Sequence, residues 1–250
     1  MRLLILGGTA DGRLCANALH PHMEVLYSVA GLVRTPAVAC EVVSGGFTSH
    51  GGLASYVSKN GIDALLDITH PYAQRMSTAV NLAAQECNIP CWRFHRPAWV
   101  PERADHWIEF SSTARLVVQL SGYTSVLWSA GQLDADTLSG LISLAPETCI
   151  VLRTAVRPPH EIPANMQWLK AIGPFNLVDE QALMQRHNID AIVSKNSGGE
   201  STVAKLQAAR LAGIPVYMQK RPDMLAADKI FTDIDSCCEY VIGQVRPLTS

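Results

Sequence analysis

The feature that most constrains the fold of this chain is a repeated alternation of short apolar runs and amphipathic stretches. The apolar runs lack polar alternation, which is typical of strands covered on both faces, so we expect mostly parallel sheets with helices on each side. In the first part of the chain we expect strands at 3–6, 25–29, 41–43, 64–68 and 91–94, and helices at 11–20, 52–59 and 72–87. The pattern predicts an α/β fold.

The alternation is interrupted at 96–102, where Pro97 and Pro101 disfavour a continuous helix or strand, and we expect a linker there. A second series follows, with strands expected at 107–110, 125–128, 150–152, 191–193 and 216–218 and helices at 111–120, 177–187, 201–212 and 235–245. We therefore predict two Rossmann-like or flavodoxin-like α/β domains with parallel sheets, residues 1–98 and 99–250. Ligands of such proteins bind at the carboxyl ends of the strands, so the active site is expected in the interdomain cleft.

The composition limits the kinds of partner that the protein can have. With 20 Lys and Arg against 22 Asp and Glu the net charge is -2, so we expect no binding to nucleic acid or to a membrane. The seven cysteines include no C-x-x-C pair, which indicates reduced thiols and no metal site. Neither a signal peptide nor an apolar run of about 18 residues is evident, so we expect a cytoplasmic protein.

A glycine turn follows the first expected strand, in the order Gly7-Gly8-Thr9-Ala10-Asp11-Gly12. Such a turn lets backbone N–H groups at a helix N-terminus approach a phosphate closely. Thr9 stands where the Rossmann motif has its second glycine, so two interpretations remain open. The turn either binds a dinucleotide or is a plain tight turn capped by Thr9 or Asp11.

The end of the second expected strand bears on which nucleotide would be bound. An NAD-selective protein usually carries an acidic residue there for the ribose 2′-hydroxyl, and residues 27–31 contain none. Ser28 and Arg34 instead offer a hydroxyl and a guanidinium, which suit the 2′-phosphate of NADPH. The alternative is a solvated loop arginine.

Two further loops at strand ends carry polar side chains. In Asp67-Ile68-Thr69-His70-Pro71, Pro71 fits a first helical turn that Thr69 or His70 would cap, and the alternative is a purely structural histidine. In the second half, Lys195-Asn196-Ser197-Gly198-Gly199 predicts an anion-binding loop at a helix N-terminus, without the spacing of a P-loop ATPase. Its alternative is a Ser or Gly cap beside a solvated lysine.

No motif of nucleophilic or metal-dependent hydrolysis is present: the chain contains neither G-x-S-x-G nor H-E-x-x-H, and no signature of paired catalytic carboxylates. This absence favours chemistry supplied by a cofactor that the protein positions.

Several segments together resemble one family. They are Gly7-Gly8-Thr9 with Gly12-Arg13, Asp67 to Ala73, Arg96-Pro97-Ala98-Trp99, Lys195 to Gly199, Gly45-Gly46-Phe47 with Gly52-Leu53 and Tyr56, and Ala204 to Arg210 with Gly213 to Val216 and Arg221-Pro222. In this order they resemble the precorrin-6A and cobalt-precorrin-6A reductases of cobalamin biosynthesis. The chain departs from the family pattern where Leu32-Val33 separate Gly31 from Arg34, and where Asp11 replaces a glutamate.

The resemblance implies an oxidoreductase that uses NADPH or NADH to reduce one carbon–carbon double bond of precorrin-6A, or its cobalt form, to precorrin-6B. It implies two α/β domains with the active site between them. Carried over by position, the nucleotide-binding residues are Gly8, Thr9, Ser28 and Arg34. Thr69 and His70 would lie near the nicotinamide, and Lys195, Ser197 and Gly198 would close the cleft.

The substrate class also predicts cations and flat apolar surface, because a tetrapyrrole precursor carries many carboxylates around an apolar ring. The candidate cations are Arg75, Arg93, Arg96, Arg153, Arg157 and Arg221, and the candidate aromatic walls are Tyr72, Trp99 and Phe175. The proton that completes the reduction could come from His70 or from water. The alternatives are a tetrapyrrole cyclase or lyase like uroporphyrinogen III synthase and a two-domain protein that binds a small ligand. The sequence predicts neither the metal content of the substrate nor the oligomeric state.

Overall fold

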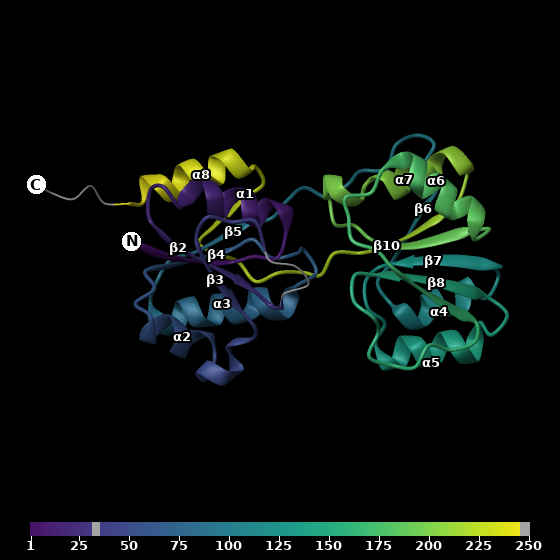
Figure 1. The fold of residues 1–250 in the computed structure, drawn as a ribbon, viewed down its shortest axis with the longest axis horizontal. Helices are drawn as coiled ribbons and strands as arrows, with labels where there is room; N and C mark the ends of the chain where they lie inside the picture. The colour runs from purple at the N-terminus through teal and green to yellow at the C-terminus, as the bar shows by residue number, and fades with distance from the viewer. Residues whose placement is uncertain (32–35, 246–250) are drawn as a thin grey trace, which may run out of the picture. The chain divides into compact units, whose positions relative to one another are not determined.

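The computed structural model describes residues 1–31 and 36–245, and they form two compact units (Figure 1). One unit comprises Met1–Pro97 and Pro222–Ser250, and the other comprises Ala98–Arg221. Arg34, expected to contact a 2′-phosphate, lies outside the described residues. Among the described residues no helix is long and apolar enough to cross a membrane, and no group of three His, Cys, Asp or Glu side chains is placed to hold a metal ion.

The first unit is built on a six-stranded parallel sheet in the order β12-β5-β4-β1-β2-β3. Its strands are β1 (Arg2–Leu6), β2 (Glu24–Val29), β3 (Glu41–Ser44), β4 (Ala64–Asp67), β5 (Cys91–Phe94) and β12 (Lys229–Phe231). Its α-helices are α1 (Ala10–Leu19), α2 (Leu53–Lys59), α3 (Gln74–Cys87) and α8 (Ile234–Gly243). In this register Leu6 of β1 lies beside Ser28 on one side and Asp67 on the other, so three strands end together.

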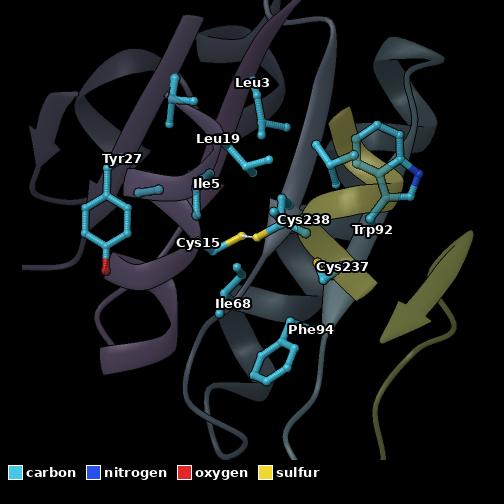
Figure 2. Close-up of a cluster of buried hydrophobic side chains, with 14 of the residues drawn as sticks. Leu3, Ile5, Cys15, Leu19, Tyr27, Ile68, Trp92, Phe94, Cys237 and Cys238 are labelled. Atoms are coloured by element: carbon cyan, nitrogen blue, oxygen red, sulfur yellow. Dashed lines mark hydrogen bonds between the residues drawn. The ribbon is translucent and has the colours of Figure 1, made fainter. Parts of the chain in front are cut away.

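Apolar side chains cover both faces of this sheet, as the short apolar runs predict. Leu3 and Ile5 pack in one cluster with residues of α1 and α8, and Leu4 and Leu6 pack in another with residues of α2 and α3. These two pairs of helices cover opposite faces of the sheet (Figure 1). Figure 2 shows the first of these clusters, where the Sγ atoms of Cys15 and Cys238 lie 3.3 Å apart. All seven cysteines are free thiols, as expected.

The second unit repeats the plan with the order β6-β11-β10-β7-β8-β9, again entirely parallel. Its strands are β6 (Trp107–Phe110), β7 (Ser125–Ser129), β8 (Cys149–Thr154), β9 (Met166–Lys170), β10 (Ala191–Lys195) and β11 (Val216–Gln219). Its α-helices are α4 (Thr113–Leu120), α5 (Ala135–Leu144), α6 (Leu177–Arg186) and α7 (Ala204–Ala212). Leu116 and Leu141 pack on one face, and Met184 and Leu206 pack on the other.

The first unit takes its outermost strand from the end of the chain, and this corrects the expected domain boundary. Residues 99–250 were predicted to form one domain, but the segment from Pro222 onward belongs to the first unit. There β12 pairs with β5, and Cys237 and Val241 of α8 pack in the same core as Cys15 of α1. Each sheet thus has the Rossmann order 3-2-1-4-5-6, and in the first unit the sixth strand, β12, comes from the segment that follows the second unit.

Candidate functional site

The glycine turn after β1 is held against β2 by close contacts. The Gly7 N–H donates to the Ser28 carbonyl at 2.8 Å, and the Gly8 N–H donates to the Tyr27 hydroxyl at 2.9 Å. A Cβ atom on Gly7 would lie 2.3 Å from the Tyr27 ring, so only glycine fits there. At Gly8 the φ angle is +105°, and apart from its two neighbours in the chain no residue that the structure describes has a heavy atom within 4 Å of the position of a Cβ.

Thr9 is the N-cap of α1. Its hydroxyl accepts the Gly12 N–H at 3.0 Å and donates to the Ile68 carbonyl at 3.1 Å, which joins the glycine turn to the loop after β4. Of the two caps that the sequence allows, the structure forms the one by Thr9. Asp11, in the first turn of α1, is paired with Arg96 at 2.9 Å, so its carboxylate is compensated.

These features fit a nucleotide phosphate. A bound phosphate needs open space over the backbone and the N-terminus of a helix, and the structure has both at Gly8 and α1, a helix of ten residues. Arg96 offsets the charge of Asp11, the acidic side chain in the first turn of α1. Ser28 is 4% exposed at the end of β2, beside the turn.

Gly7→Ala is expected to lower the free energy of unfolding by about 1–3 kcal/mol, because the added methyl group displaces Tyr27 from a packed core. Urea denaturation measures this. Gly243→Ala is the matched control, because a Cβ there meets no side chain of residues 1–31 or 36–245 within 4 Å, and it should change stability by less than about 0.5 kcal/mol. Equal effects of the two substitutions would contradict the clash.

The loop after β4 is organised by Asp67, which is 1% exposed. Its carboxylate accepts the Thr69 N–H at 3.1 Å, the Thr69 hydroxyl at 2.7 Å and the Arg93 Nε–H at 2.9 Å. The Nδ1 atom of His70 accepts the Tyr72 N–H at 3.3 Å, so the proton of the neutral ring is assigned to Nε2.

The predicted capping of the next helix by Thr69 or His70 is wrong. Helix α3 begins at Gln74 after Ala73, with no side-chain cap. The physical reason is that the Thr69 hydroxyl is engaged by Asp67, while the His70 carbonyl accepts the Ala73 N–H at 2.7 Å and closes a turn before the helix starts.

In the second unit, Lys195 ends β10 and its Nζ lies 3.4 Å from the Cβ position of Gly131. Burial lowers the pKa of Lys195. Ser197 is 8% exposed and its hydroxyl lies 3.3 Å from that of Thr202, while Gly198 has a φ of +69°. These residues form one loop.

The helix expected from 201 starts later. A 3₁₀ turn at Glu200–Thr202, capped by Gly199, precedes α7, which has no side-chain cap. The alternative interpretation, a Ser or Gly cap of the long helix, is therefore wrong, because the 3₁₀ turn separates these residues from α7.

Two arginines expected to meet substrate carboxylates are paired inside the protein. Arg93 is 3% exposed and pairs with Asp67, and Arg153 is 5% exposed and pairs with Glu180. Arg153 also donates to the Ser129 hydroxyl at 3.1 Å and lies 4.3 Å from the centre of the Phe175 ring. Both arginines organise the strand ends.

The comparisons with known proteins cover nearly the whole chain. The family described as "Precorrin-6x reductase CbiJ/CobK" matches residues 2–242. A precorrin-6A reductase of Rhodococcus erythropolis is 37% identical over 246 residues, which are 96% of this chain and 97% of that protein. The chain belongs to the precorrin-6x reductase family.

Further relatives agree with this assignment to the precorrin-6x reductases. A precorrin-6A reductase of Mycobacterium tuberculosis H37Rv is 35% identical over 245 residues, 97% of this chain and 98% of that protein. The solved structure "CobK precorrin-6A reductase" has a TM-score of 0.86 and 28% identity, and the match covers 97% of both chains. The chain is thus an oxidoreductase with two Rossmann-like units, and membership of a reductase family implies a nicotinamide cofactor.

The structure of this precorrin-6x reductase family member also shows how its loops are held, which the sequence did not predict. Tyr27, Asp67 and Arg93 hold the loops of the first unit, and Asn196 holds the loop of the second by two hydrogen bonds to the Trp99 backbone. An aspartate directly after an apolar strand was the available signal for Asp67. The other three partners are defined only by the fold.

Proposed function

We propose that this protein reduces one carbon–carbon double bond of precorrin-6A, or of its cobalt form, with NADPH, and yields precorrin-6B for cobalamin biosynthesis. The observation that carries the proposal is the family match over residues 2–242, which includes the glycine turn, the loop after β4 and the loop after β10. It disfavours the tetrapyrrole lyase and the small-ligand binding protein that the sequence also allowed.

NADPH supplies the hydride, and the chain's own residues bind and orient it. Gly8, Thr9 and Ser28 would hold the nucleotide, with Thr9 acting through the geometry that it gives to α1. Arg34 would contact the 2′-phosphate. Thr69, fixed by Asp67, would lie near the nicotinamide, and Ser197 and Gly198 would contact the cofactor from their own loop.

Two side chains are assigned to the substrate. Lys195 would bind a carboxylate of the tetrapyrrole, because its burial strengthens the attraction of an ammonium group for an anion. His70 would donate the proton to the carbon next to the one that receives hydride. It would do so in the imidazolium form, which returns to the neutral ring whose Nδ1 contacts the Tyr72 N–H at 3.3 Å.

The proposal is tested by mixing the purified protein with NADPH and precorrin-6A, and in parallel with cobalt-precorrin-6A. We expect loss of NADPH absorbance that depends on the substrate, and a product heavier by two hydrogens. NADPH that binds, seen as quenching of tryptophan fluorescence, but is not oxidised with either substrate would overturn the reaction. The parallel arms also show which form is preferred.

Arg34→Ala is expected to weaken NADPH binding about tenfold to a hundredfold and to leave NADH binding nearly unchanged, because a guanidinium pairs with the 2′-phosphate that only NADPH carries. Quenching of tryptophan fluorescence measures both dissociation constants. Arg115→Ala, at an exposed position in α4, is the control. Equal weakening of both nucleotides would show that Arg34 does not reach the 2′-phosphate.

A further inference from the structure

Lys205 is a buried lysine in the second unit that the proposed reaction does not use. It is 3% exposed and lies in the first turn of α7, although lysines are rarely buried without a carboxylate partner. Its Nζ donates to the Thr202 carbonyl at 2.9 Å and lies 5.0 Å from the centre of the Trp99 ring. This places an amine beneath the loop after β10.

Two routes connect Lys205 to the loop that carries Lys195 and Ser197. In the first, the Thr202 carbonyl accepts a hydrogen bond from the Lys205 amine, and the Thr202 hydroxyl lies 3.3 Å from the Ser197 hydroxyl. In the second, the Trp99 ring covers the amine, and the Trp99 backbone binds Asn196 at both its N–H (2.8 Å) and its carbonyl (3.0 Å). Lys205 therefore supports the segment 195–202.

The charges around Lys205 do not balance when it is protonated. The charged groups that act on it are Arg153 of β8 and Glu180 of α6, which are paired with each other and both buried. Burial, followed by the Arg153 guanidinium, lowers the pKa of Lys205 to about 7, while Glu180 acts in the opposite direction. The positive end of the α7 dipole also disfavours a cation at this position. Within the part of the chain that the structure describes, one carboxylate, Glu180, therefore faces two cationic groups, Arg153 and the protonated Lys205.

We propose that Lys205 is a positioning residue that takes up a proton when the loop 195–202 binds an anionic group, a carboxylate of the tetrapyrrole or a phosphate of the nucleotide. The inference rests on the proposed function. Without ligand the neutral amine still donates to Thr202, so the loop keeps its form. A bound anion supplies the missing charge through a poorly screened interior and thereby favours the ammonium form.

Calorimetric titration tests this proposal with two probes, NADPH and precorrin-6A. The titrations are run at about pH 8 in two buffers of different ionisation enthalpy, because the difference in heat gives the number of protons bound. A group with a pKa of about 7 is about one-tenth protonated at that pH. If the ligand raises the pKa to 8 or above, at least about 0.4 proton per ligand is taken up.

The matched variants are Lys205→Met, which keeps the apolar stem, and Lys59→Met, at an exposed position in α2. We expect the proton uptake that accompanies binding of at least one probe to disappear in Lys205→Met and to persist in Lys59→Met. If the probes bind Lys205→Met with the same proton uptake as the wild type, or bind the wild type with no proton uptake, the inference is overturned and the proposed function is not. Failure of both probes to bind overturns the proposed function and the inference with it.

A second measurement needs no variant. If binding takes up a proton at a group with a pKa of about 7, the dissociation constant of that ligand must rise as pH rises above 7, approaching tenfold per unit until the pKa of the complex is reached. A dissociation constant that is flat between about pH 7 and 9 for both probes contradicts the proposal.

Discussion

Arg93→Met is expected to lower the free energy of unfolding by about 3–5 kcal/mol, because it leaves a buried carboxylate without its partner. Arg93 and Asp67 are 3% and 1% exposed, and their ion pair spans 2.9 Å. Arg93 also donates to the Leu225 carbonyl, so its loss loosens the returning segment of the first unit. Urea denaturation followed by circular dichroism gives the change in free energy.

The control for this prediction is Glu24→Gln. Glu24 forms an ion pair of the same length with Arg2, but its side chain is 61% exposed, so the substitution should cost less than about 1 kcal/mol. If Arg93→Met costs no more than Glu24→Gln, Asp67 is either neutral or hydrated in the folded protein. The assigned organisation of the loop after β4 would then be incorrect.

His70→Phe is expected to lower kcat about 10²–10⁴-fold while KM changes little, because the ring keeps its size and loses the hydrogen that would protonate the substrate carbon. The phenyl ring can keep the packing on Tyr72, whose ring centre lies 5.7 Å away. Steady-state kinetics with NADPH and precorrin-6A separate kcat from KM.

His22→Phe, at an exposed position after α1, is the matched control and should leave both constants unchanged. A kcat for His70→Phe within a few-fold of the wild type would show that water donates the proton. A large rise in KM with kcat unchanged would instead make His70 a binding residue.

The elements that the sequence predicted well are those with long or strongly apolar patterns, such as β1, α3 and β10. One α-helix and two strands were missed for local reasons. Helix α5 contains Gly140 and two serines, which are weak helix formers, and β9 follows an irregular proline-rich segment. Strand β12 has only three residues, Lys229 to Phe231, and becomes a strand because β5 offers it an edge.

The sequence predicted those portions of the candidate site whose residues are consecutive in the chain. The glycine turn and the loop 195–199 are contiguous, and each is found at the end of a strand as expected. The ion pairs were not predictable, because Asp67 and Arg93 lie 26 residues apart and meet only when β4 pairs with β5. The sequence analysis took Arg93 and Arg153 for substrate ligands because their carboxylate partners, Asp67 and Glu180, are distant in the sequence.

The return of the chain's end to the first unit has a consequence for how the chain folds as it leaves the ribosome. Residues 98–221 contain every element of the second unit, so we expect it to close while synthesis continues. The first unit begins earlier and finishes later, because β12 and α8 are made last. Until then β5 presents an unpaired edge and α1 an uncovered apolar face, the features by which nascent chains aggregate. A ribosome that stops shortly after residue 221 would release a chain with a complete second unit and an incomplete first unit that is prone to aggregate.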